Sequence, residues 1–220
     1  MSASPRRLVI LISGRGSNMQ ALAEACRAGR IPAQVAAVVS NRPDVEGLHR
    51  AAALGIPTAV VDHTAFPSRE AFDAALLEEV QNHEPDLVAL AGFMRILTAA
   101  FVSPLLGRIL NIHPSLLPKY PGLDTHRRAL EAGDREAGAT VHFVTEALDG
   151  GPPILRVRVP IHPDDTPESL AARVLAWEHP LYVEAVRLVA AGRVRWTPGG
   201  VMFDGAPLPR EGLEFTGTPL

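Results

Sequence analysis

The residues best suited to chemistry lie in the segment Asn111-Ile-His-Pro-Ser115. Asn111 and His113 are two positions apart where a β-strand is expected to end, so an extended backbone directs both side chains to one face. Pro114 follows at once and restricts the backbone, which fixes where those side chains point. An amide donor beside an imidazole suits a reaction in which an oxygen gains negative charge while a proton moves. Taken alone, the pattern fits a structural histidine about equally well.

A carboxylate that could assist the histidine lies in the glycine-rich turn Asp149-Gly-Gly151. If Asp149 lies near His113, its negative charge would favour the protonated imidazole. In such turns, however, an aspartate more often accepts a hydrogen bond from its own backbone. The turn by itself therefore leaves both interpretations open.

A second feature suited to ligand binding is the loop Ser13-Gly-Arg-Gly-Ser-Asn18. Gly14 and Gly16 allow the backbone to turn tightly and to approach a ligand. Ser17 and Asn18 come at the start of an expected helix, as candidate caps and as side-chain donors, and the free amides there suit a phosphate. A glycine turn capped by a serine is the simpler alternative.

Several familiar motifs are excluded. Met19 stands where the dinucleotide fingerprint needs its third glycine, and a Walker A loop needs a lysine, whereas the only lysine is Lys119. No Gly-x-Ser-x-Gly elbow occurs, Cys26 falls within an expected helix, and the eight histidines form no His-Glu-x-x-His or Cys/His cluster. We therefore expect non-covalent catalysis without a metal.

A third loop, Gly92-Phe-Met-Arg-Ile-Leu97, is apolar apart from Arg95. A flat heterocycle could lie against Met94, Ile96 and Leu97, with its polar edges meeting backbone groups. A connection that packs on the core, with Arg95 in solvent, is at least as compatible with the pattern.

The elements that position these loops alternate along the first half of the chain. Short apolar runs predict buried strands, and stretches with helical spacing lie between them. The strands are expected at 8–12, 35–39, 58–61, 87–90 and 108–112, and the helices at 17–28, 45–54 and 68–82. This alternation indicates a Rossmann-like α/β fold, with a mostly parallel sheet and helices on both faces. Ligands bind such sheets beyond the carboxyl ends of the strands, where all three loops fall.

The pattern changes after residue 139. Runs at 140–145 and 154–159 predict an antiparallel pair at the sheet edge, residues 168–191 a long amphipathic helix, and residues 194–203 a short hairpin. We expect one domain over 1–204 and a loose Pro- and Gly-rich tail over 205–220.

Composition limits the class of protein. The 220 residues are 47% hydrophobic and 20% charged, enough to form a core, and the net charge of −3 argues against nucleic acid as a partner. Apolar runs are too short for a membrane helix. A single cysteine and an N-terminus unlike a signal peptide make the cytoplasm the expected location.

Four segments together resemble the glycinamide ribonucleotide transformylases, the folate-dependent phosphoribosylglycinamide formyltransferases of purine biosynthesis. The resemblance runs in order over about residues 8–192, and the Asn-x-His-Pro-Ser motif alone marks the wider formyltransferase superfamily. The segments are Ile12-Ser-Gly-Arg-Gly-Ser-Asn18, Leu90-Ala-Gly-Phe-Met-Arg-Ile-Leu97, Leu110-Asn-Ile-His-Pro-Ser-Leu-Leu-Pro118 and Val141-His-Phe-Val-Thr-Glu-Ala-Leu-Asp-Gly-Gly151.

The resemblance implies a formyltransferase fold and a role for each site residue. Asn111 would donate to the formyl oxygen, His113 would be the general acid, and Asp149 would keep it protonated. The substrate glycinamide ribonucleotide would meet Gly16, Ser17, Asn18 and Glu178. The co-substrate 10-formyltetrahydrofolate would meet Arg69, Met94, Arg95, Ile96, Leu97 and Asn111. The amine of the ribonucleotide would attack the formyl carbon directly, through a tetrahedral intermediate.

Two positions depart from the pattern and leave their own roles open. Arg15 stands where relatives carry Asn or Thr, and Asp124 replaces a histidine of bacterial members. A 10-formyltetrahydrofolate deformylase and a non-catalytic Rossmann-like binding protein are the alternative functions. We expect only small-molecule substrates, and a monomer or homodimer.

Overall fold

The computed structural model describes residues 5–219, built around one eight-stranded sheet in the order β11-β7-β6-β5-β4-β1-β2-β3. The strands β1 to β5 run parallel, whereas β6 is antiparallel to β5 and to β7. The Rossmann-like α/β prediction is confirmed, and so is the antiparallel pair near the edge. The strands are β1 (Arg6–Ile12), β2 (Ala33–Ser40), β3 (Thr58–Val60), β4 (Leu87–Leu90), β5 (Ile109–His113), β6 (Glu136–Phe143), β7 (Pro153–Pro160) and β11 (Leu213–Glu214).

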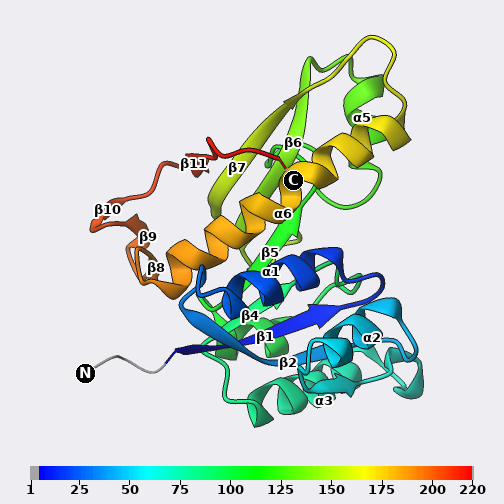
Figure 1. The fold of residues 1–220 in the computed structure, drawn as a ribbon, viewed down its shortest axis with the longest axis vertical. Coiled ribbons are helices and arrows are strands. Elements are labelled where there is room, and N and C mark those ends of the chain that lie inside the picture. Colours follow the sequence, from blue (N-terminus) through cyan, green and yellow to red (C-terminus); the bar gives the residue numbers. More distant parts are fainter. Residues whose placement is uncertain (1–4, 220) are drawn as a thin grey trace.

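Helices cover both faces because side chains alternate along the buried strands. In β1, Leu8, Ile10 and Ile12 join the core under α1 (Ser17–Arg27), α2 (Glu46–Ala53) and α6 (Pro167–Ala190). Val9 and Leu11 point the other way, into a core with α3 (Arg69–Asn82), α4 (Ala99–Val102) and the short turn η2 (Ser103–Leu105). A second short turn, η1 (His63–Ala65), precedes α3. Figure 1 shows α6 crossing the sheet beside α1.

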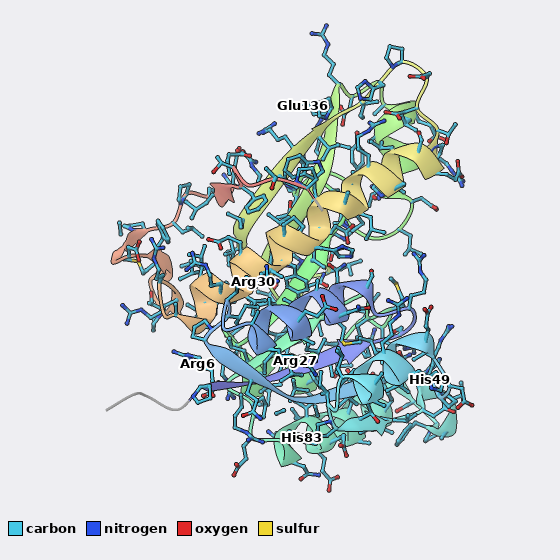
Figure 2. All side chains as sticks on the ribbon, viewed as in Figure 1. Arg6, Arg27, Arg30, His49, His83 and Glu136 are labelled. Atoms are coloured by element: carbon cyan, nitrogen blue, oxygen red, sulfur yellow. The ribbon has the colours of Figure 1, made fainter. Side chains whose placement is uncertain are left out.

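The remaining helix, α5 (Thr125–Glu131), packs against α6 near the β6–β7 hairpin. The molecule is elongated along this direction. In Figure 2, Glu136 at the start of β6 lies near one end and His83, just after α3, near the other. The strands β1, β4 and β5, whose ends carry the candidate site, lie between these two ends of the molecule (Figure 1).

The predicted cap of α1 is wrong. Neither Ser17 nor Asn18 caps the helix, because both lie inside its first turn and Gly16 is the N-cap, with φ 74° and no side-chain cap. A Cβ on Gly16 would lie 2.8 Å from the Cα of Gly47, so the position excludes a side chain by close approach as well as by φ. The predicted end of the helix is correct, since Gly29 follows with φ 70°.

The hairpin expected at 194–203 is present as β8 (Val194–Thr197) and β9 (Gly200–Phe203). The expectation of a loose tail is wrong for residues 205–219. β10 (Ala206–Pro207) extends the hairpin to a three-stranded sheet, and β11 pairs in parallel with β7. Arg156, which is buried, binds the carboxylates of Glu211 and Glu214. Leu220 lies outside the described residues, and the domain boundary at 204 stays a prediction.

The strand order creates a switch point between β1 and β4. The chain leaves β1 toward α1 on one face and leaves β4 toward α4 on the other. In open sheets of this kind, the two loops that leave a switch point in opposite directions frame a ligand crevice at the carboxyl edge. The loops that leave this switch point are the glycine loop 13–17 and the apolar loop 92–98, and we expect them to form the two walls of that crevice.

Candidate active site

His113 ends β5 and is 6% exposed. Its Nε2 lies 2.8 Å from the backbone oxygen of Tyr120, so Nε2–H donates there and the neutral ring leaves Nδ1 without a proton. Nδ1 lies 3.4 Å from Oδ2 of Asp149. A proton taken up by His113 therefore enters at Nδ1, between the imidazole and a carboxylate.

The position of the Asp149 carboxylate is set by residues outside its own turn. Its φ of 49° is left-handed, a conformation that aspartate tolerates better than most residues. Oδ2 accepts a hydrogen bond from the backbone N–H of Gly122 at 2.8 Å, and Oδ1 lies 3.7 Å from Nε2 of His142. The side chain is 8% exposed. The carboxylate thus faces two histidines, and the alternative that it serves its own turn finds no support.

Asn111 lies in register with His142 across the β5–β6 ladder. Its Nδ2 is 3.2 Å from Nε2 of His142, whose Nδ1 lies 2.9 Å from the oxygen of Phe143. These partners assign the neutral tautomer in which Nδ1–H donates to Phe143 and Nε2 accepts from Asn111. Burial lowers the pKa of His142, with the Phe143 carbonyl and Asp149 opposing it, which also favours the neutral ring. One hydrogen of the Asn111 amide remains free for a ligand.

His142 is the member of this cluster that the sequence analysis missed. The antiparallel pair of β5 and β6 would have pointed to it, because the residue opposite Asn111 must share its face. The strands were predicted without the register between them, however, and only that register shows that His142 lies opposite Asn111.

The segment after His113 is fixed by hydrogen bonds rather than by its prolines alone. Ser115 Oγ donates to the carbonyl of Lys119, and Thr140 Oγ1 donates to the carbonyl of Ser115. The hydroxyl of Tyr120 donates to Asp134 at 2.8 Å. These contacts place the Tyr120 carbonyl and the Gly122 amide where His113 and Asp149 meet them.

A cavity lies beside Asn111, between the β4 loop and the turn before Asp149. Leu97 is buried in the loop, Met94 and Ile96 are 65% and 51% exposed, and the buried Nε of Arg95 has no hydrogen-bond partner. An unpaired buried donor in an apolar wall fits a flat ligand with polar edges. The cavity is lined by Leu90, Phe93, Arg95, Ile96, Leu97, Asn111, His142, Val144, Thr145, Glu146, Ala147, Leu148 and Asp149.

The other predicted ligand residues fall into two groups. Asn18 is buried in the first turn of α1, where its Nδ2 donates to Oε2 of Glu178 on α6 at 2.9 Å and its Oδ1 has no partner. Burial raises the pKa of Glu178, and the Asn18 donor partly opposes it. Arg69, in contrast, is exposed at the start of α3 and does not line the cavity.

The positions whose roles were left open lie at the surface. Arg15 is exposed in the glycine loop, and Asp124 is exposed before α5, with φ 58° and no side-chain cap. Burial raises the pKa of Cys26 to about 11, which keeps its thiol protonated at neutral pH. Over residues 5–219, no group of His, Cys, Asp and Glu side chains could hold a metal ion, and none of the helices could cross a membrane.

Comparison with known proteins identifies the family. The formyl transferase family model matches residues 6–186, which is most of the chain. The chain belongs to the formyl transferase family. This formyl transferase domain contains all five strands of the parallel part of the sheet and every candidate site residue.

Individual members of the formyl transferase family are similar over nearly the whole chain. Phosphoribosylglycinamide formyltransferase of Escherichia coli (strain K12) is 51% identical over 93% of this chain and 97% of that protein. The human trifunctional purine biosynthetic protein adenosine-3 is 44% identical over 88% of this chain but only 19% of its own length. The solved phosphoribosylglycinamide formyltransferase of Coxiella burnetii superposes with a TM-score of 0.91 at 49% identity, covering 96% of this chain and 99% of that one.

Proposed function

We propose that the protein transfers the formyl group of 10-formyltetrahydrofolate to the amine of glycinamide ribonucleotide. The products are formylglycinamide ribonucleotide and tetrahydrofolate, in the biosynthesis of purines. Membership of the formyl transferase family and the similarity to phosphoribosylglycinamide formyltransferases over almost the full chain support this reaction.

The observation that carries the proposal is the convergence of Asn111, His113 and Asp149. Asn111 offers a free amide hydrogen toward the cavity, and His113 Nδ1 lies 3.4 Å from Asp149. An oxygen that gains negative charge needs fixed donors, and an amide and a protonated imidazole are both suited to that role. Ligand binding without catalysis does not require an amide donor and a histidine next to a carboxylate, so this arrangement favours an enzyme.

The reaction assigns a step to each group. The amine nitrogen attacks the formyl carbon, and the formyl oxygen, which gains negative charge, accepts hydrogen bonds from Asn111 Nδ2 and from the protonated Nδ1 of His113. Asp149 stabilises that imidazolium as its counter-charge. The bond between the formyl carbon and the folate nitrogen then breaks, and the proton lost by the attacking amine ends on that nitrogen, through water held by Asp149.

The two substrates take opposite walls of the crevice in this proposal. Gly16 and Ser17 present backbone amides at the start of α1 to the phosphate, where the helix dipole favours an anion. Glu178, held by Asn18, meets the glycinamide end of the ribonucleotide. The folate lies against Met94, Arg95, Ile96 and Leu97 with its formyl group at Asn111, and Arg69 meets its exposed end.

We also propose a compartment and an oligomeric state for the protein. Cys26 has no partner for an intrachain disulfide, which supports a reducing compartment such as the cytoplasm. We take the active form to be a monomer or a homodimer that binds only these small molecules.

The test is whether loss of the formyl group depends on the acceptor. Purified protein is mixed with 10-formyltetrahydrofolate, with and without glycinamide ribonucleotide, and tetrahydrofolate is followed with time. Formation of tetrahydrofolate only when the ribonucleotide is present supports the transferase. Equal formation without it would instead indicate the deformylase, and no formation in either mixture would contradict both enzymes.

A further inference from the structure

Ser13, the first residue of the glycine loop, bonds twice to the apolar loop that leaves the other side of the switch point. It follows β1 directly, opens the glycine loop and is 7% exposed. Its backbone N–H donates to the oxygen of Gly92 at 3.2 Å, and its Oγ accepts a hydrogen bond from the backbone N–H of Met94 at 2.7 Å. The first half of the apolar loop is therefore fixed to the first residue of the glycine loop.

The Ser13 hydroxyl has a defined direction. Its only proton goes to Oδ1 of Asn41 at 2.5 Å, so the oxygen is free to accept from Met94. Asn41 is 1% exposed at the end of β2, and its Nδ2 lies 3.2 Å from Nδ1 of His63. Hydrogen bonds in a buried chain of this kind reinforce one another, so the hydroxyl is a rigid point of attachment.

The other end of the apolar loop has a separate anchor. Thr98 N–H donates to Oδ2 of the fully buried Asp73 on α3. Asp73 fixes this loop to a helix, whereas Ser13 fixes it to the opposite wall of the crevice. Among the side-chain hydrogen bonds of residues 5–219, the one from Met94 to Ser13 is the contact that joins the two loops.

We propose that Ser13 is a positioning residue that sets the distance between the two substrates by holding the loop 92–98 against the loop 13–17. The inference rests on the proposed function, in which one loop holds the ribonucleotide phosphate and the other the folate. Ser13 itself is assigned no contact with either substrate. Its hydroxyl contributes to the rate because attack of the amine on the formyl carbon requires the two loops to hold their substrates at the correct distance and orientation.

The test separates the rate of transfer from the binding of each ligand. In Ser13→Ala, Met94 N–H and Asn41 Oδ1 both lose their partner. The backbone bond from Ser13 N–H to the Gly92 oxygen remains, but the loop from Met94 onward is free to shift against the loop 13–17. A misplacement of about 1 Å costs on the order of 100-fold in rate, so we expect kcat to fall about 10- to 100-fold. The dissociation constants of glycinamide ribonucleotide and tetrahydrofolate, each measured alone by calorimetry, should change less than about threefold.

A matched control comes from the neighbouring strand end. Ser40 is also a buried serine, but its hydroxyl donates to the oxygen of Arg42 and reaches neither loop. Ser40→Ala should therefore leave kcat unchanged. Ser13→Cys fills the position with a larger thiol that is only a weak donor and acceptor, so it should slow the transfer as Ser13→Ala does, and it provides a second variant if the alanine variant does not fold.

Two results would overturn the inference. One is an unchanged kcat in the folded Ser13 variants, and the other is a loss confined to the affinity for tetrahydrofolate, which would make Ser13 a local part of one loop. Failure of the proposed function would be visible separately, because the unmodified protein would then show no acceptor-dependent transfer.

Discussion

Oδ2 of Asp149 lies 3.4 Å from Nδ1 of His113, while the opposite nitrogen of the ring donates to the Tyr120 carbonyl. Both ring nitrogens thus have partners, and only the one beside the carboxylate is free to exchange a proton. The same Oδ2 accepts a hydrogen bond from Gly122, which keeps the carboxylate in place. This arrangement places beside His113 a negative charge that can be removed without changing the shape of the site.

Asp149→Asn makes that change. An asparagine oxygen can still accept from Gly122, but the imidazolium of His113 loses its counter-charge. Activity should fall, because the imidazolium that donates to the developing oxyanion is no longer stabilised by a negative charge. The measurement is kcat/KM, with Asp44→Asn as control because Asp44 is also left-handed, at φ 52°, and exposed. A kcat/KM equal to that of the unmodified protein would contradict the role of the counter-charge.

Glu178 provides a prediction about stability. Burial raises its pKa above the ordinary value of 4.5, so the folded carboxyl holds its proton to higher pH than the unfolded one does. Between those two values the folded state binds more protons, and the free energy of unfolding falls as pH rises. In Glu178→Gln this part of the slope should disappear.

Urea unfolding of the Glu178 variant between about pH 4 and pH 7 measures that slope. The control is Glu24→Gln, an exposed glutamate on α1, which should leave the slope as it is in the unmodified protein. An identical slope in the Glu178 variant would show that this carboxyl is not desolvated.

The C-terminal segment supports the edge of the sheet. A chain ended after Arg210 loses β11 and leaves the buried Arg156 without the carboxylates of Glu211 and Glu214. Those carboxylates are partly exposed, so we expect a loss of about 1 to 2 kcal/mol, or about 2 to 8 °C in Tm.

A second substitution identifies the cause of that loss. Arg156→Met in the shortened chain removes the unpaired charge and should restore part of the Tm, whereas Arg195→Met, at an exposed position of β8, should not. An unchanged Tm on shortening would mean that the segment adds nothing to the fold.

The part of the site that lies within one segment could be predicted from the local sequence pattern. Asn111 and His113 share a face because a strand alternates, and Pro114 follows them directly. The strands β1, β2, β4 and β5 were predictable from continuous apolar runs, which are typical of strands buried on both faces. β3 was predicted from a similar run, although it lies at the sheet edge and Val60 is exposed.

Predictions from local pattern were wrong where distant residues decide the outcome. Gly16 caps α1 in place of Ser17 because Gly47 packs against it, which no feature of the loop reveals. His142 depends on the β5–β6 register, and the expected loose tail is held by Arg156, far away in sequence. Arg69, in contrast, was assigned by resemblance alone; it is not among the residues that line the cavity, and its role stays a prediction.

His113→Asn tests most directly whether His113 is the acid of a formyl transfer to glycinamide ribonucleotide. Acceptor-dependent formation of tetrahydrofolate should fall by about 10²- to 10⁴-fold, the range expected when a positioned acid is lost, with the Tm within about 2 °C of the unmodified protein. His49→Asn, at an exposed position of α2, should retain full activity. A folded His113 variant with activity close to that of the unmodified protein would contradict the account.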